Sequence, residues 1–148
     1  MTDIRFYQLQ QKKLEHALPE ILAKALERQH RVIVKTSNPE RLQELDQSLW
    51  SYNPESFLPH SASRDEYTPE QPIWLTTEED DPNQATALIL VDGAISGAVN
   101  TVGLCCELFD GNDESAVLAA RERWKVYKDQ GHTLTYFQQD EAGKWQKK

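Results

Sequence analysis

The chain has 148 residues, of which 39% are hydrophobic and 27% charged, and its formal net charge at pH 7 is -8. This length fits one domain, and residues 1–148 are expected to fold around a single core. A chain this acidic argues against direct DNA binding, which needs many Lys and Arg side chains. No stretch has the pattern of a signal peptide or a bilayer-spanning helix, so a cytoplasmic protein without a membrane contact is expected.

Apolar periodicity, cap residues and the positions of Pro and Gly divide the chain into strands and helices. Strands are expected at residues 4–9, 31–36, 72–75, 85–93, 103–111 and 132–139, and helices at residues 12–31, 37–50 and 114–130. Pro19 should mark a place where a helical turn breaks or begins. The second helix has Ser37 or Asn38 as its cap and Pro39 in its first position. Residues 51–71 are expected to be mainly loop because they hold several prolines.

The order of these elements predicts one three-layer α/β domain, in which helices flank a mostly parallel central sheet. The sequence contains neither a glycine-rich phosphate-binding motif nor a recognisable catalytic nucleophile with its base. Cys105 and Cys106 are adjacent within an apolar run and are expected to be reduced core thiols, and neither a metal nor a cofactor is expected. A nucleotide-binding or enzymatic α/β domain without a recognisable motif is the alternative.

The last predicted helix, capped by Asp113 or Ser115, carries the residues that point to a function. Its apolar side consists of Ala116, Ala120, Trp124 and Tyr127, and its basic stripe, at i, i+4 and i+7, consists of Arg121, Lys125 and Lys128. Val117 and Trp124 lie on the border between the two sides. An aromatic border beside fixed cations suits a ligand that carries an apolar group and a carboxylate on one short segment. The alternative is an ordinary amphipathic helix whose solvated face is basic.

Three segments, IRFYQL at residues 4–9, LWSYNPESFLPH at 49–60 and RERWKVYKDQGHTL at 121–134, share one resemblance. They resemble, in the same order and at the same overall chain length, the chi subunit family of bacterial DNA polymerase III. Trp124 stands where Tyr is common in that family, which keeps an aromatic wall. The helix has no basic residue before Arg121, so the resemblance implies a less basic site than in relatives.

The resemblance implies a single α/β domain with a largely parallel sheet and a non-enzymatic role. Chi subunits are accessories of the clamp-loader complex that bind the acidic, phenylalanine-terminated tail of single-stranded-DNA-binding protein and pair with the psi subunit. Arg121, Trp124 and Lys125 match the tail-binding residues of the family. Val117 and Lys128 are added to the expected tail site because of their places on the same helix.

Two aromatic residues of the middle segment match the family's contacts with psi or another clamp-loader component. They are Trp50 and Phe57. Trp50 ends the helix predicted at residues 37–50, and Phe57 lies in a proline-bounded loop. A place in the hydrophobic core is therefore the alternative for both.

Overall fold

The structure, a computed structural model, describes residues 2–10, 14–51, 60–61, 72–77, 79, 85–142 and 144–147. Its strands are β1 (Asp3–Leu9), β2 (Val32–Lys35), β3 (His60–Ser61), β4 (Ile73–Thr76), β5 (Ala87–Val91), β6 (Leu104–Asp110), β7 (Thr133–Gln139) and β8 (Trp145–Lys147). Its helices are α1 (Leu14–Glu27), α2 (Pro39–Ser51) and α3 (Glu114–Asp129), with a short 3-10 helix, η2 (Gly97–Asn100).

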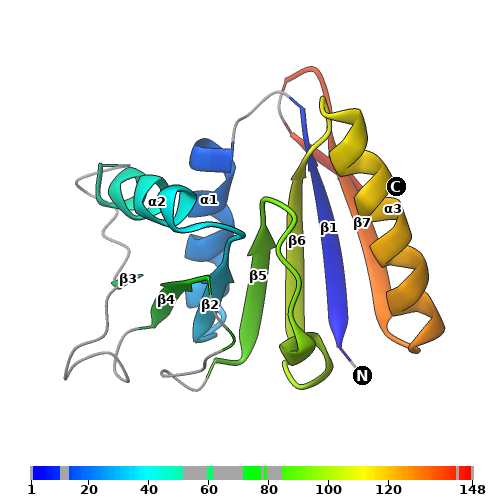
Figure 1. The fold of residues 1–148 in the computed structure, drawn as a ribbon, viewed down its shortest axis with the longest axis horizontal. Helices are drawn as coiled ribbons and strands as arrows, with labels where there is room; N and C mark the ends of the chain where they lie inside the picture. Colours follow the sequence, from blue (N-terminus) through cyan, green and yellow to red (C-terminus); the bar gives the residue numbers. More distant parts are fainter. Residues whose placement is uncertain are drawn as a thin grey trace.

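The described strands form one sheet in the order β3-β4-β2-β5-β6-β1-β7-β8. All neighbouring strands are parallel except β7 and β8, which are antiparallel. Helices α1 and α2 pack on one face of the sheet and α3 packs on the other (Figure 1). The predicted α/β fold, with a mostly parallel sheet between helical layers, is confirmed.

Alternate side chains of the central strands face the two helical layers. In β6, Cys106 and Leu108 join the apolar cluster with α1 and α2, whereas Cys105 and Phe109 join the cluster with α3. The central strands are apolar on both sides because helices cover both faces. The two thiols therefore point to opposite faces of the sheet, and both are free and buried, as the sequence predicted.

Proline has different roles in the first two helices. Pro39 begins α2, and the Asn38 side chain caps this helix by accepting a hydrogen bond from the backbone N–H of Arg41 at 2.7 Å. Pro19 lies buried inside α1, so the prediction that it breaks or begins a helical turn is wrong. The helix tolerates the lost backbone hydrogen bond because its apolar side packs tightly on the sheet.

One short strand lies inside the proline-rich segment that was expected to be mainly loop. This strand, β3, runs parallel to β4, with His60 opposite Ile73. Two residues are too few for a strand pattern to be visible in the sequence. The rest of the segment, residues 52–59 and 62–71, lies outside the described residues.

The buried thiols should be inert in the folded protein. Cys105 and Cys106 are 0% and 3% exposed, and burial raises the pKa of both thiols, that of Cys106 to about 12. Because the thiolate is the reactive form, Ellman's reagent at mildly alkaline pH should label neither cysteine in the native state and both after unfolding in guanidinium chloride. Rapid labelling of the native protein would contradict this packing.

Candidate functional site

Helix α3 is fixed at both ends by local interactions. The Asp113 carboxylate accepts hydrogen bonds from the backbone N–H groups of Ser115 at 3.0 Å and Ala116 at 3.4 Å. Beyond the other end, Gly131 has a φ of 84°, a backbone conformation that glycine adopts readily and that ends the helix. Of the two predicted caps, Asp113 is the one that the structure confirms.

The inner side of α3 packs on a cluster of aromatic rings around Phe6 of β1. Phe6 is 0% exposed, and its ring centroid lies 5.3 Å from that of Trp124 and 6.0 Å from that of Tyr127. Ala120, one helical turn before Trp124, is buried and lets the helix approach the sheet. Tilted and edge-to-face ring pairs of this kind are favourable. The predicted apolar side of the helix is therefore confirmed, with Trp124 half-buried at its edge.

The predicted site residues lie along one side of α3, here termed the basic flank: Val117, Arg121, Trp124, Lys125 and Lys128. The three cations are exposed, whereas the two apolar side chains are half-buried. Among the described residues, Arg121 and Lys128 make no ion pair, and Lys125 lies 3.5 Å from Glu122 with side chains 70% and 74% exposed. Such an exposed pair contributes about 0–1 kcal/mol. All three cations are therefore available to an anionic partner.

Tyr136 of β7 lies beside the basic flank, and the sequence did not single it out. Its ring centroid is 5.9 Å from that of Trp124, in an edge-to-face arrangement, and its hydroxyl donates a hydrogen bond to Gln8 Oε1. Partial burial raises the pKa of Tyr136, and the charge of Arg121, three residues before Trp124 on α3, partly offsets that rise. Trp124 and Tyr136 thus provide two half-buried aromatic walls next to a free guanidinium.

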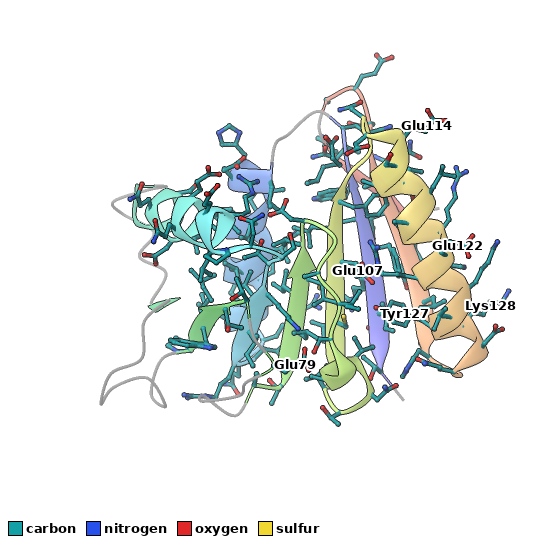
Figure 2. The ribbon with its side chains drawn as sticks, viewed as in Figure 1. Glu79, Glu107, Glu114, Glu122, Tyr127 and Lys128 are labelled. Atoms are coloured by element: carbon teal, nitrogen blue, oxygen red, sulfur yellow. The ribbon has the colours of Figure 1, made fainter. Side chains whose placement is uncertain are left out.

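A buried ion pair joins the other side of α3 to the sheet. Arg123 Nε donates a hydrogen bond to Glu107 Oε1 of β6 at 2.6 Å, and the two side chains are 15% and 2% exposed. Glu107 is labelled in Figure 2. Burial raises the pKa of Glu107, and the charge of Arg123 partly offsets that rise. The second carboxylate oxygen, Oε2, is buried without a hydrogen-bond partner among the described residues. The sequence reasoning missed this pair, although a glutamate inside an apolar strand is a signal that a partner is needed.

Of the two residues expected to face a clamp-loader partner, only Trp50 belongs to the described part of the fold. Trp50 belongs to α2, on the sheet face opposite α3, and its side chain is not among those described. Phe57 lies outside the described residues. The partner interface at Trp50 and Phe57 therefore stays a prediction.

In the described residues, no group of three or more His, Cys, Asp or Glu side chains is arranged to hold a metal ion. None of the helices in this part of the chain has the length and apolar character needed to cross a bilayer.

The mostly parallel sheet, the two helical layers and the basic flank define a three-layer α/β protein with a cationic and aromatic surface on α3. The family model described as "DNA polymerase III chi subunit, HolC" matches residues 1–135, and the chain belongs to this family. The matched range includes the whole of α3 and its basic flank.

Two relatives carry the same name. The chain is 28% identical over 91 residues to the probable DNA polymerase III subunit chi of Rickettsia prowazekii, which covers 56% of this chain and 55% of that protein. It is 34% identical over 92 residues to the DNA polymerase III subunit chi of Pseudomonas aeruginosa, which covers 62% of each chain. The chain thus aligns with less than two thirds of the length of either relative.

Removal of Arg123 should destabilise the protein strongly. Arg123→Ala leaves the buried Glu107 carboxylate without its cation, and breaking a buried pair in this way typically costs about 3–5 kcal/mol of unfolding free energy. The double variant Glu107→Gln/Arg123→Met removes both charges and should recover much of that loss. Urea denaturation followed by tryptophan fluorescence measures the unfolding free energy of both variants. Equal losses of unfolding free energy in the single and the double variant would contradict a coupled pair.

The burial of Glu107 should leave a signature in the pH dependence of stability. Because the pKa of Glu107 is raised in the folded state, the folded state holds this proton more tightly than the unfolded chain does. The resulting stabilisation is present at low pH and is lost as the pH rises from the ordinary value of 4.5 through the raised folded value. Glu107→Gln should remove this component from the curve of unfolding free energy against pH.

Proposed function

We propose that this chain is a non-catalytic accessory subunit of the DNA polymerase III clamp-loader complex that binds the acidic C-terminal tail of single-stranded-DNA-binding protein. Membership of the chi family supports a role in replication. The observation that carries the tail-binding proposal is the exposed Arg121 beside the half-buried rings of Trp124 and Tyr136. The proposed tail ends in Phe, whose single residue offers one ring and one free carboxylate.

The proposed contacts follow from the two groups of the terminal Phe, its aromatic ring and its free carboxylate. The Phe ring lies against Trp124 and Tyr136, where edge-to-face contacts are favourable. The guanidinium of Arg121 binds the terminal carboxylate through two parallel hydrogen bonds, which the planar fork of an arginine allows. The ion pair between Arg121 and the terminal carboxylate contributes more binding free energy than an exposed ion pair, because the aromatic walls exclude water from one side of it.

Lys125 and Lys128 extend the basic flank along α3 and meet the Asp residues of the tail. Both are exposed, so their contributions are smaller and weaken as salt screens the charges. The flank is thus a local region of positive charge on a chain whose net charge is -8. This local reversal of sign explains how an acidic protein binds an acidic peptide without binding DNA in general.

A second partner, the psi subunit or another clamp-loader component, binds at Trp50 and Phe57 in this proposal. The resemblance of the middle segment to the family supports this assignment. Helix α2, which carries Trp50, packs on the face of the sheet opposite α3. In this proposal a partner at Trp50 and the tail at the basic flank lie on different faces of the sheet and can be bound together, in the cytoplasm where the chromosome is replicated.

Arg121→Ala should weaken binding of a tail peptide ending in Phe by about 1.5–3 kcal/mol, because a charge-assisted hydrogen bond is lost. Amidation of the peptide's C-terminus should cause a similar loss in the wild-type protein and little further loss in the variant, since both changes remove the same contact. Isothermal titration calorimetry of the four combinations measures this coupling. Lys24→Ala, which removes an exposed cation from α1 on the other sheet face, is the matched control and should bind as wild type.

Two results would contradict this assignment. Additive losses from amidation and Arg121→Ala would mean that Arg121 does not hold the terminal carboxylate. An unchanged affinity in Trp124→Ala, with the protein still folded by circular dichroism, would mean that the ring does not lie on the aromatic walls. Arg121→Lys should restore only part of the affinity, because an ammonium group lacks the planar fork.

The double variant Trp50→Ala/Phe57→Ala should lose binding to purified psi while it keeps tail binding and most of its melting temperature. The reason is that exposed aromatic anchors contribute to an interface without supporting the core. If the variant unfolds instead, both residues belong to the core, where each such change typically costs about 3–5 kcal/mol. That outcome would contradict the interface and leave the proposal for the basic flank unaffected.

A further inference from the structure

A groove of about 660 Å³ lies on the side of α3 opposite the basic flank. One wall is the segment from Ile95 to Asn100, which includes η2, and the other is the C-terminal half of α3. Glu79, Glu122 and Tyr127, all labelled in Figure 2, are among the lining residues. A volume in this range accommodates several side chains of a bound segment. It is here termed the acidic groove because its most exposed charged side chains are carboxylates.

Exposed apolar side chains concentrate at the acidic groove. The described residues include three large apolar side chains that are clearly exposed, and two of them, Ile95 at 67% and Val126 at 52%, line the groove from opposite walls. Val99 and Tyr127, which are buried, also line it. Apolar side chains that face each other across a hollow, unlike scattered ones, mark a contact surface. The third, Leu118, belongs to α3 but does not line the groove.

The charge that a partner meets in this groove is negative. Its two cations, Lys35 and Arg123, are only 13% and 15% exposed, and each is already paired with a carboxylate, Glu79 and Glu107 respectively. The carboxylates at its rim, Glu79 and Glu122, are paired as well, with Lys35 and Lys125, but they are far more accessible than the two lining cations, since their side chains are 53% and 74% exposed. The sign of the accessible charge is therefore opposite to that of the basic flank.

The groove wall is held in place before any partner binds. The Lys35 ammonium donates a hydrogen bond to the backbone carbonyl of Ile95 at 2.8 Å, and the Ser96 hydroxyl accepts one from the backbone N–H of Ala98 at 3.1 Å, which caps η2. On the other wall, the Arg123 pair with Glu107 anchors α3 to the sheet. A wall fixed in this way costs less ordering entropy on binding than a mobile one.

We propose that the acidic groove docks a segment of a partner protein that carries apolar side chains together with Lys or Arg. The apolar side chains contact Ile95 and Val126, and the basic ones lie near Glu79 and Glu122. The occupant differs in sign from the acidic tail proposed for the basic flank, so charge directs the two ligands to opposite sides of one helix. The proposal stands on the groove alone and does not depend on tail binding.

The test uses the full chain, labelled with nitrogen-15, and three short amphipathic peptides with blocked ends as probes. The first is built from Leu and Lys, the second from Leu and Glu, and the third from Ser and Lys. We expect saturable binding of the Leu/Lys peptide, with the largest amide shifts in residues 95–100 and 122–130, and binding at least about tenfold weaker for the other two. The Leu/Lys peptide should bind more weakly as salt is added.

Variants separate the groove from general attraction to an acidic protein. Ile95→Ser/Val126→Ser should weaken binding of the Leu/Lys peptide by about tenfold or more, whereas Leu118→Ser removes an equally exposed apolar side chain of α3 and should have no effect. Glu79→Gln/Glu122→Gln should weaken binding and reduce its dependence on salt. Arg121→Ala should leave this binding unchanged, and a Phe-terminated acidic peptide should not compete with it.

Three outcomes would overturn the proposal: amide shifts located elsewhere on the chain, equal binding of the Leu/Glu peptide, or wild-type binding by Ile95→Ser/Val126→Ser. A failure of this kind leaves the tail-binding measurements on Arg121 unaffected. Failure of the Arg121 experiments, in turn, leaves the groove measurements unaffected. The two proposals are therefore tested separately on the same protein.

Discussion

The packing of α3 on Phe6 is the interaction on which the surface features of this protein depend. Phe6 is fully buried, and its ring contacts the rings of Trp124, Tyr127 and Tyr136. A helix held by rings on two of its turns cannot rotate about its axis without losing these contacts. The rotation of α3 decides which side chains face β7 and which face the segment 95–100. Both the basic flank and the acidic groove thus follow from one buried aromatic cluster.

The Glu107–Arg123 pair adds a second constraint, of a different kind. A buried ion pair is a weak source of net stability, because removing both charges from water costs about as much as their attraction returns. It is specific, however, since a shift of α3 along the sheet would leave a buried charge unpaired. The pair also withdraws Arg123 from the surface, so that the side of α3 away from β7 presents carboxylates. One helix thereby carries accessible charges of opposite sign on its two sides.

Local interactions explain why so much of the secondary structure was predictable. The caps at Asn38 and Asp113 and the helix end at Gly131 involve residues only a few positions apart, so the sequence displays them directly. The periodicity of α3 likewise predicted its exposed cations and its buried side, because a helix repeats regularly. Pro19 was misjudged because the burial of α1 against the sheet outweighs a local rule. The two-residue strand β3 was missed because its pairing with β4 is not local.

The sequence by itself therefore determined the α/β class, the limits of α3 and the identity of its exposed cations. Only the tertiary structure decided which side chains lie next to these cations. Tyr136 reaches the basic flank, and its hydroxyl reaches Gln8, because β1 lies between β6 and β7, although these two residues are 128 positions apart. Ile95 likewise lines the same groove as Val126 only because the segment after β5 returns beside α3. Contacts of this kind depend on which strands become neighbours, and that order is set by the burial of the whole sheet between two helical layers and not by any local pattern.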